Sequence, residues 1–117
     1  MSRPEIPITV FRSETLTQPF CLVDRRTRLG LDLTGKIVRF TVRAALDEAI
    51  LISKQTGAGI VHDPDQVASP GKFTLTVPAA EHTALGAFDH RWDLWVDDEL
   101  WVAPSLYDVR DSVRFGR

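Results

Sequence analysis

Hydrophobic and polar residues alternate along much of this chain with a period of two, which is typical of β-strands that bury one face. The alternation is clearest in the runs 36–43, 72–77 and 90–96. From Val38 to Val42, from Phe73 to Val77 and from Trp92 to Val96, every second residue is large and apolar, and the residues between are threonine, arginine, aspartate or tryptophan. The pattern therefore predicts three central strands with one face in a shared core.

Shorter apolar runs predict further strands on both sides of these three. We expect strands at 8–11, 16–23, 50–54, 99–102 and 107–113. Asp97-Asp98 separates two of the predicted strands and indicates a tight hairpin, because aspartate tolerates the unusual φ of such turns. The glycines of 57–59 predict a loop or bulge, and the prolines and aspartates of 62–71 predict an exposed connection.

Helix signals are few. Pro78 near the start and Gly86 just after the end predict one or two helical turns over 79–85, and 43–48 is a candidate for a further helical turn before the extended run that starts at Ile50. Seven or eight short strands in 117 residues predict an all-β fold, an antiparallel β-sandwich of the immunoglobulin-like kind, with a small barrel as the alternative. We expect a single domain over 1–117, with its core at about 6–114.

Composition supports a folded protein and narrows its partners. Hydrophobic residues make up 44% and charged residues 26%, as in ordinary globular domains. The net charge is −2, so we expect no nucleic-acid partner. The first residues are too polar for a secretory signal, and no apolar run approaches the ~18 residues of a membrane span. We therefore expect synthesis in the cytoplasm without a signal peptide, and no membrane partner.

The residues that most often carry catalysis form no recognised motif here. His62 and the two aspartates after it resemble a ligand group, but His-Asp-Pro-Asp is also an ordinary polar turn. His90 takes an inward strand position, whereas His82 is expected to be exposed on the helical turn. Cys21, the only cysteine, lies in an apolar strand and is expected to be buried and inert. We predict no catalytic residue, metal or cofactor, and no enzyme.

The three tryptophans are the most informative side chains. Trp92 alternates in phase with apolar residues and is predicted to fill the core. Trp95 falls on the opposite face, across the hairpin from the region of Trp101. An outward pair could anchor a protein interface, stack on a sugar, or form a cross-strand aromatic pair under a loop. Asp89 and Asp93 are spaced like a carboxylate pair, which an exposed strand face explains equally well.

The segment Asp32-Leu33-Thr34-Gly35 is predicted to be a structural turn. Asp32 and Thr34 can satisfy backbone donors, and Leu33 can anchor the loop to the core. Gly35 permits a positive φ before the next strand. This motif carries no catalytic chemistry.

The same segment is the first of several that resemble a known protein family. Leu31 to Gly35 followed by 36–43 resembles the "D-L-T-G-x-x-V-x-F-x-V-R" segment of small phage tail and baseplate proteins, among them the immunoglobulin-like N-terminal domain of phage baseplate upper proteins. Further counterparts follow at 71–77, 80–85, 90–96 and 111–114. The chain departs from that pattern at His90 and Trp92, where the family has tyrosines, and at Pro104-Ser105, where it often has glycine.

This resemblance implies a non-enzymatic structural or assembly protein of a phage or prophage tail or baseplate. Its partners would be other tail or baseplate proteins, with a homo-oligomer as a further expectation, and its location the virion or a tail-like particle. The chain holds one domain and no fibre region, which favours an accessory or connector role. The alternative is a carbohydrate- or other ligand-binding β-sandwich that uses exposed tryptophans.

Overall fold

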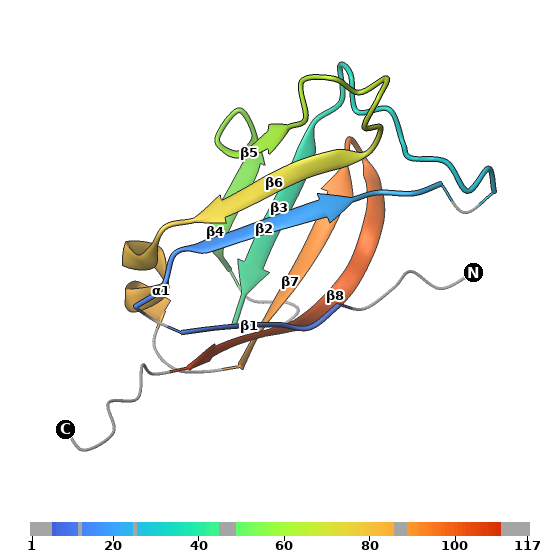
Figure 1. The fold of residues 1–117 in the computed structure, drawn as a ribbon. Coiled ribbons are helices and arrows are strands. Elements are labelled where there is room, and N and C mark those ends of the chain that lie inside the picture. The colour runs from blue at the N-terminus through green and yellow to red at the C-terminus, as the bar shows by residue number, and fades with distance from the viewer. Residues whose placement is uncertain (1–5, 12, 25, 45–48, 86–88, 111–117) are drawn as a thin grey trace.

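The predicted strands form a single curled sheet (Figure 1). The structure is a computed structural model that describes residues 6–11, 13–24, 26–44, 49–85 and 89–110. Its elements are β1 (Ile8–Phe11), β2 (Leu16–Cys21), β3 (Val38–Arg43), β4 (Ile50–Thr56), β5 (Gly59–His62), β6 (Lys72–Val77), α1 (Ala79–Leu85), β7 (Asp89–Val96) and β8 (Glu99–Arg110). The all-β fold with one short helix is therefore confirmed.

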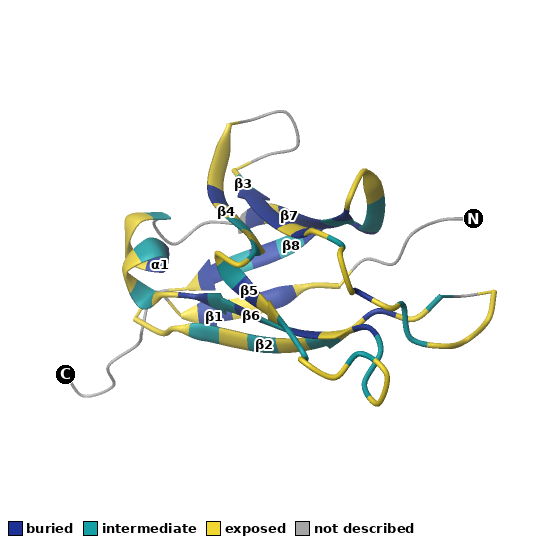
Figure 2. Ribbon diagram, turned by 90° about the horizontal axis from the view of Figure 1, so that it is seen from above, coloured by how far each residue is buried: buried dark blue, intermediate teal, exposed yellow. Residues whose placement is uncertain are grey.

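The order of the strands makes the sheet curl. The sheet runs β1-β8-β7-β3-β4-β5-β6-β2, so that β1 and β2 are its two edges. Only four residues connect these edges along the chain, and such a link spans at most about 18 Å. Viewed from above, β2, β5 and β6 form one layer and β3, β7 and β8 the other (Figure 2). The result is a nearly closed sandwich or barrel.

Two of the strand pairs are parallel, which the prediction of an antiparallel sandwich did not include. β1 pairs with β8, and β4 pairs with the strand that follows it, β5. The second pairing is short and depends on Gly57 and Gly59, whose φ values are 88° and 98°. Because glycine adopts such φ values without a steric penalty, the chain can form a tight loop within a few residues and continue in the same direction. The predicted loop at 57–59 thus leads directly into β5, a strand that the alternation pattern did not predict.

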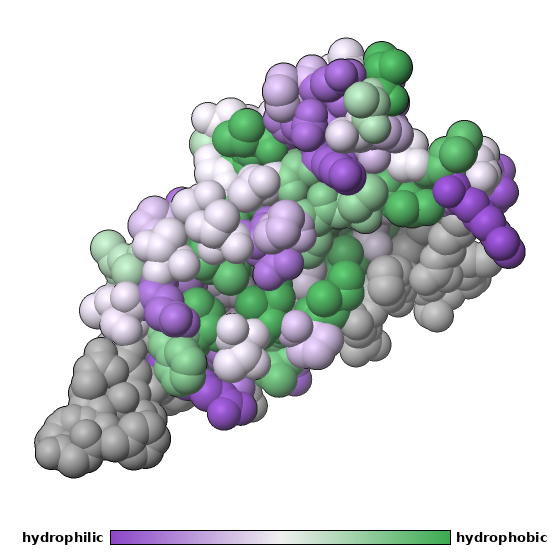
Figure 3. All heavy atoms as spheres, viewed as in Figure 1, coloured by the Kyte–Doolittle hydropathy of each residue, from purple (hydrophilic) through white to green (hydrophobic). Residues whose placement is uncertain are grey.

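Aromatic side chains join the two layers. The rings of Phe20 and Phe73 stack with centroids 5.1 Å apart, and Phe20 also lies 6.0 Å from Trp92 in the opposite layer. Phe40 then contacts Trp92 and Tyr107 at 5.3 and 5.8 Å. Trp92 is 1% exposed, as its position in the alternation predicted. In the space-filling view, hydrophobic side chains show below β2, towards β8 (Figure 3).

The last strand is longer than predicted. The two strands expected at 99–102 and 107–113 are one strand, β8, which contains Pro104. Two register shifts against β7 place an extra residue of β8 first between Val102 and Ser105 and then between Leu100 and Val102. Because proline cannot donate a ladder hydrogen bond, its place at a bulge lets the strand continue through it. Residues 111–113 lie outside the described residues.

The expectation that His82 is exposed is wrong, because α1 lies across one end of the curled sheet (Figure 1) and His82 faces inward with no exposed surface. Its Nδ1 lies 2.8 Å from the Glu14 carbonyl oxygen, and its Nε2 lies 2.5 Å from the Tyr107 hydroxyl. A carbonyl only accepts, so Nδ1 carries the proton and Tyr107 donates to Nε2. Burial raises the pKa of Tyr107, which keeps its hydroxyl a donor. One imidazole thus ties α1 to β8 and to the β1–β2 connection.

Two other predictions about burial have opposite outcomes. His90 is buried, at 1% exposure, as its inward strand position predicted. Cys21, which was expected to be buried, is exposed. Alternation along β2 turns Phe20 towards the core, so its neighbour Cys21 must point outward.

His82→Ala is expected to lower the free energy of unfolding by about 2–4 kcal/mol, because it opens a cavity and leaves the Tyr107 hydroxyl without its acceptor. Tyr107→Phe keeps the ring and is expected to cost about 1–3 kcal/mol. Urea unfolding of both single variants and the double variant measures the coupling. Additive losses would contradict the hydrogen bond described here.

Candidate functional site

The two tryptophans proposed as an outward pair do not form one platform. Trp95 lies partly exposed on the outer face of β7, opposite Arg39 of β3 and Leu100 of β8. Trp101 is the extra residue of a bulge in β8 and packs against the core cluster. Among the described residues, no aromatic contact joins the two rings. The bulge takes Trp101 out of the alternation on which the expectation rested.

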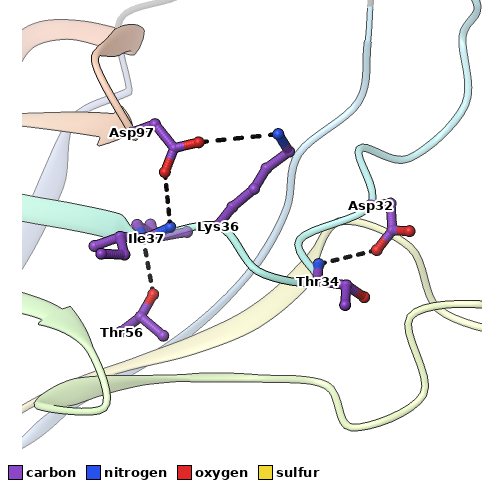
Figure 4. A network of polar contacts seen from close by, with 7 residues as sticks. Asp32, Thr34, Lys36, Ile37, Thr56 and Asp97 are labelled. Atoms are coloured by element: carbon purple, nitrogen blue, oxygen red, sulfur yellow. Dashed lines mark hydrogen bonds and ion pairs between the residues drawn. The ribbon is translucent and has the colours of Figure 1, made fainter.

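The β7–β8 hairpin ends in the tight turn that the sequence predicted. Asp97 there has a φ of 52°, a left-handed conformation that aspartate adopts more readily than most residues. Its N–H donates to the Ile37 carbonyl at 2.8 Å, and its Oδ1 accepts from the Ile37 N–H at 3.0 Å. Its Oδ2 lies 3.9 Å from Lys36 Nζ (Figure 4). The carboxylate therefore extends the β3–β7 ladder by one residue.

The segment 32–35 forms a turn beside this hairpin. Asp32 Oδ1 accepts from the Thr34 N–H at 2.9 Å (Figure 4), and this bond is the main cause that lowers the pKa of Asp32. Leu33 is fully buried, and Gly35 has a φ of 74°. Gln66, whose role no sequence pattern indicated, holds the turn from the other side, because its Oε1 accepts from the Leu33 N–H at 3.1 Å. These hydrogen bonds hold the backbone of the 32–35 turn in place.

The described surface includes two hollows near these elements. The first, of 360 Å³, lies between the 32–35 turn and the hairpin and includes Lys36, Asp97, Asp98, Glu99 and Trp101 in its lining. The second, of 570 Å³, lies over β2, β5 and β6 and includes Pro19, Cys21, Val61, Lys72 and Thr74. No group of three or more His, Cys, Asp or Glu side chains that could hold a metal ion occurs among the described residues.

His62 and the two aspartates after it do not converge. His62 Nε2 lies 2.8 Å from Thr56 Oγ1, which accepts from the Val38 N–H at 2.8 Å. Asp63 Oδ1 instead accepts from the Asp65 N–H at 2.9 Å, as in a polar turn. Burial lowers the pKa of His62. The neutral imidazole can accept a hydrogen bond from the Thr56 hydroxyl, and Thr56 in turn accepts from the β3 backbone.

The outer face of β3 and β7 brings together charged residues that the sequence pattern did not connect. Arg39 lies opposite Trp95, Thr41 opposite Asp93, and Arg43 opposite Arg91. We call this set of six residues the arginine face. The signal in the sequence was the outward parity of 39, 41 and 43 and of 91, 93 and 95. Only the antiparallel register shows that these two rows are neighbours.

Asp93 at the centre of the arginine face is 9% exposed, so it is more buried than an exposed strand face would make it. The Thr41 hydroxyl donates to its Oδ1 at 2.5 Å. Thr41 is also 9% exposed, so both partners of this hydrogen bond are shielded from solvent. The face thus combines a shielded carboxylate, three guanidinium groups and one indole ring.

Comparisons with protein-family models, with curated proteins and with solved structures find no match for this chain. The resemblance to phage tail proteins therefore depends on the sequence segments quoted above. In the part of the chain that the structure describes, no helix is long and apolar enough to cross a membrane.

Asp97→Ala is expected to lower the free energy of unfolding by about 1–2 kcal/mol, because the Ile37 N–H loses its acceptor and alanine resists the positive φ. Asp97→Asn keeps an Oδ1 acceptor and is expected to lose little. Asp98→Ala, in the same turn and exposed, is the matched control. Urea unfolding compares the three variants, and equal losses in Asp97→Ala and Asp97→Asn would contradict the role of Oδ1.

The lowered pKa of His62 predicts a loss of stability in mild acid. As the pH falls below 6.5, the ordinary pKa of histidine, His62 becomes protonated in the unfolded chain while it stays neutral in the folded protein. The free energy of unfolding therefore decreases as the pH falls from about 6.5 to the lower pKa of His62 in the folded protein. His62→Gln is expected to flatten this part of the stability–pH curve relative to the wild type. The measurement is urea unfolding at a series of pH values, with an NMR titration of His62. A His62 pKa above 6.5 would contradict the prediction.

Proposed function

We propose that this chain is a non-enzymatic structural or assembly protein of a phage or prophage tail or baseplate, and that it acts through protein–protein contacts. The proposed setting, a phage tail or baseplate, comes from the sequence resemblance. The observation that carries the mode of action is the arginine face, where a partly exposed Trp95 lies opposite exposed Arg39 on an outer sheet face. Tryptophan and arginine are the residue types most enriched where protein interfaces concentrate their binding energy.

The shape of this face supports a protein partner over a small ligand. The sheet curls around the aromatic core, so its outer side is convex. Small molecules bind mostly in concave pockets that enclose most of their surface. A convex face with one indole and several guanidinium groups suits the large, complementary surface of another protein. Since Trp95 and Trp101 do not form a shared platform, we do not extend the proposal to carbohydrate binding.

The proposed partners are other tail or baseplate proteins. Further copies of this chain are also proposed as partners, in a ring-shaped homo-oligomer. Most closed homo-oligomers have cyclic symmetry. In a tail assembly, a symmetric partner protein can also arrange the copies of this chain in a ring. The proposed location is the assembled virion or a tail-like particle. Synthesis in the host cytoplasm is part of the same proposal.

The test of this function is incorporation into tail particles. In an induced lysogen that encodes the chain, antibodies against it should detect the wild-type protein in purified tails. Trp95→Ala is expected to reduce this incorporation about tenfold, because hot-spot truncations commonly cost more than 1 kcal/mol of binding. Far-UV circular dichroism and urea unfolding should show that the variant remains folded.

Val61→Ala is the matched control, because Val61 is an exposed apolar residue, 69% exposed, on β5 and outside the arginine face. It should enter tails like the wild type. Absence of the wild-type protein from purified tails would refute the proposed setting. Glycan binding that quenches tryptophan fluorescence, and that Trp95→Ala abolishes, would favour the carbohydrate alternative instead.

A further inference from the structure

The arginine face holds more positive charge than its own carboxylate can balance. Arg43 and Arg91 lie directly opposite each other, and like charges in that position destabilise a sheet. Arg39 occupies the same face four residues before Arg43 on β3. Asp93 is the one acidic residue of these six, so the set carries three formal positive charges against one negative charge, although the chain as a whole has a net charge of −2. Asp89 and Asp108 lie opposite each other beyond Arg91, on β7 and β8.

Ion pairs among the described residues do not neutralise these arginines. The cations in those pairs are Lys36, Lys54 and Arg110. Arg43 Nε is buried and has no hydrogen-bond partner. Because that atom is shielded from solvent while the residue is partly exposed, a docked carboxylate would contact Arg43 through its terminal guanidinium nitrogens. Arg39 and Arg91 are exposed and extend the same charge to the surface.

We propose that the arginine face docks an acidic surface of a separate protein, whose carboxylates pair with Arg39, Arg43 and Arg91 while an apolar group packs on Trp95. This inference depends on the proposed function and names the chemistry of the partner at the same face. Planar guanidinium groups bind carboxylates through two parallel hydrogen bonds, which fixes the orientation of the partner. The indole beside Arg39 lowers the local exposure to water and strengthens such pairs.

The charge pattern favours carboxylates on a protein over the phosphates of a nucleic acid. Asp93 lies in the middle of the arginines, where it would repel a continuous row of phosphates. A protein surface can place separate carboxylates over each guanidinium and leave the centre uncharged. Such complementary charges also accelerate and orient the encounter.

The probe for this inference is fluorescein-labelled oligoglutamate, and its binding is measured by fluorescence anisotropy. The wild type should bind at about 50 mM salt and more weakly at about 300 mM, because salt screens exposed charges. Arg43→Gln/Arg91→Gln is expected to bind about tenfold more weakly, since it removes two charge-assisted contacts. The matched control is Arg26→Gln/Arg28→Gln, which changes the net charge equally at two exposed arginines between β2 and β3.

Tighter binding of the wild type and the control than of the face variant supports the proposal. It is overturned if oligoglutamate does not bind, or if both double variants lose affinity equally, because net charge alone would then explain the effect. Duplex DNA that binds the face more tightly than oligoglutamate would also overturn it in favour of a phosphate ligand. Self-association in light scattering that only the face variant loses would make a second copy the occupant and overturn the assignment to a separate protein.

Incorporation into tails separates this inference from the proposed function. If oligoglutamate does not bind while Trp95→Ala still lowers incorporation into tails, the inference of an acidic partner is wrong and the proposed assembly role stands. If oligoglutamate binds as expected but the wild-type protein is absent from tails, the acidic partner stands and the setting is wrong.

Discussion

The packing of Phe20 against Trp92 determines the shape of this molecule. Phe20 lies on an edge strand and Trp92 in the middle of the sheet, so their 6.0 Å approach requires the sheet to curl until its two layers meet. The four-residue link between β1 and β2 holds the edges near each other without backbone pairing. Burial of these large rings, worth roughly 1.5–3 kcal/mol for each side chain, is the main favourable term that sustains the curl.

The position of the arginine face follows from that interior. Once Phe40 and Trp92 point inward, alternation turns Thr41, Asp93 and their neighbours outward, and a slip of one residue would reverse both faces. The dry core therefore fixes which charged residues gather on the convex side. Asp97 supports the same register, because its carboxylate extends the β3–β7 ladder at the hairpin end. Core packing and surface chemistry are thus two consequences of one strand register.

Local sequence patterns predicted the elements better than their connections. The three strongest alternating runs became β3, β6 and β7, and the proline and glycine signals placed α1 within a residue. The pattern failed at His82 and Cys21, because a side chain's exposure depends on what packs over it and on which residue of a strand faces the core. It failed at β5, where the glycines that indicate a loop also allow a short parallel pairing. The arginine face required the pairing of strands that lie about fifty residues apart, which no local pattern contains.

The parallel pairing of β1 with β8 has a consequence for the order in which the chain can fold. Ile8 lies beside Tyr107, and β8 is the only strand next to β1 among the described residues. During translation β1 therefore has no hydrogen-bonding partner of this sheet until β8 has left the ribosome. Contacts so distant in sequence delay closure of the sheet and place β-sheet proteins of this kind among the slower folders, in milliseconds to seconds. The sheet described here is complete only when β1 has joined β8.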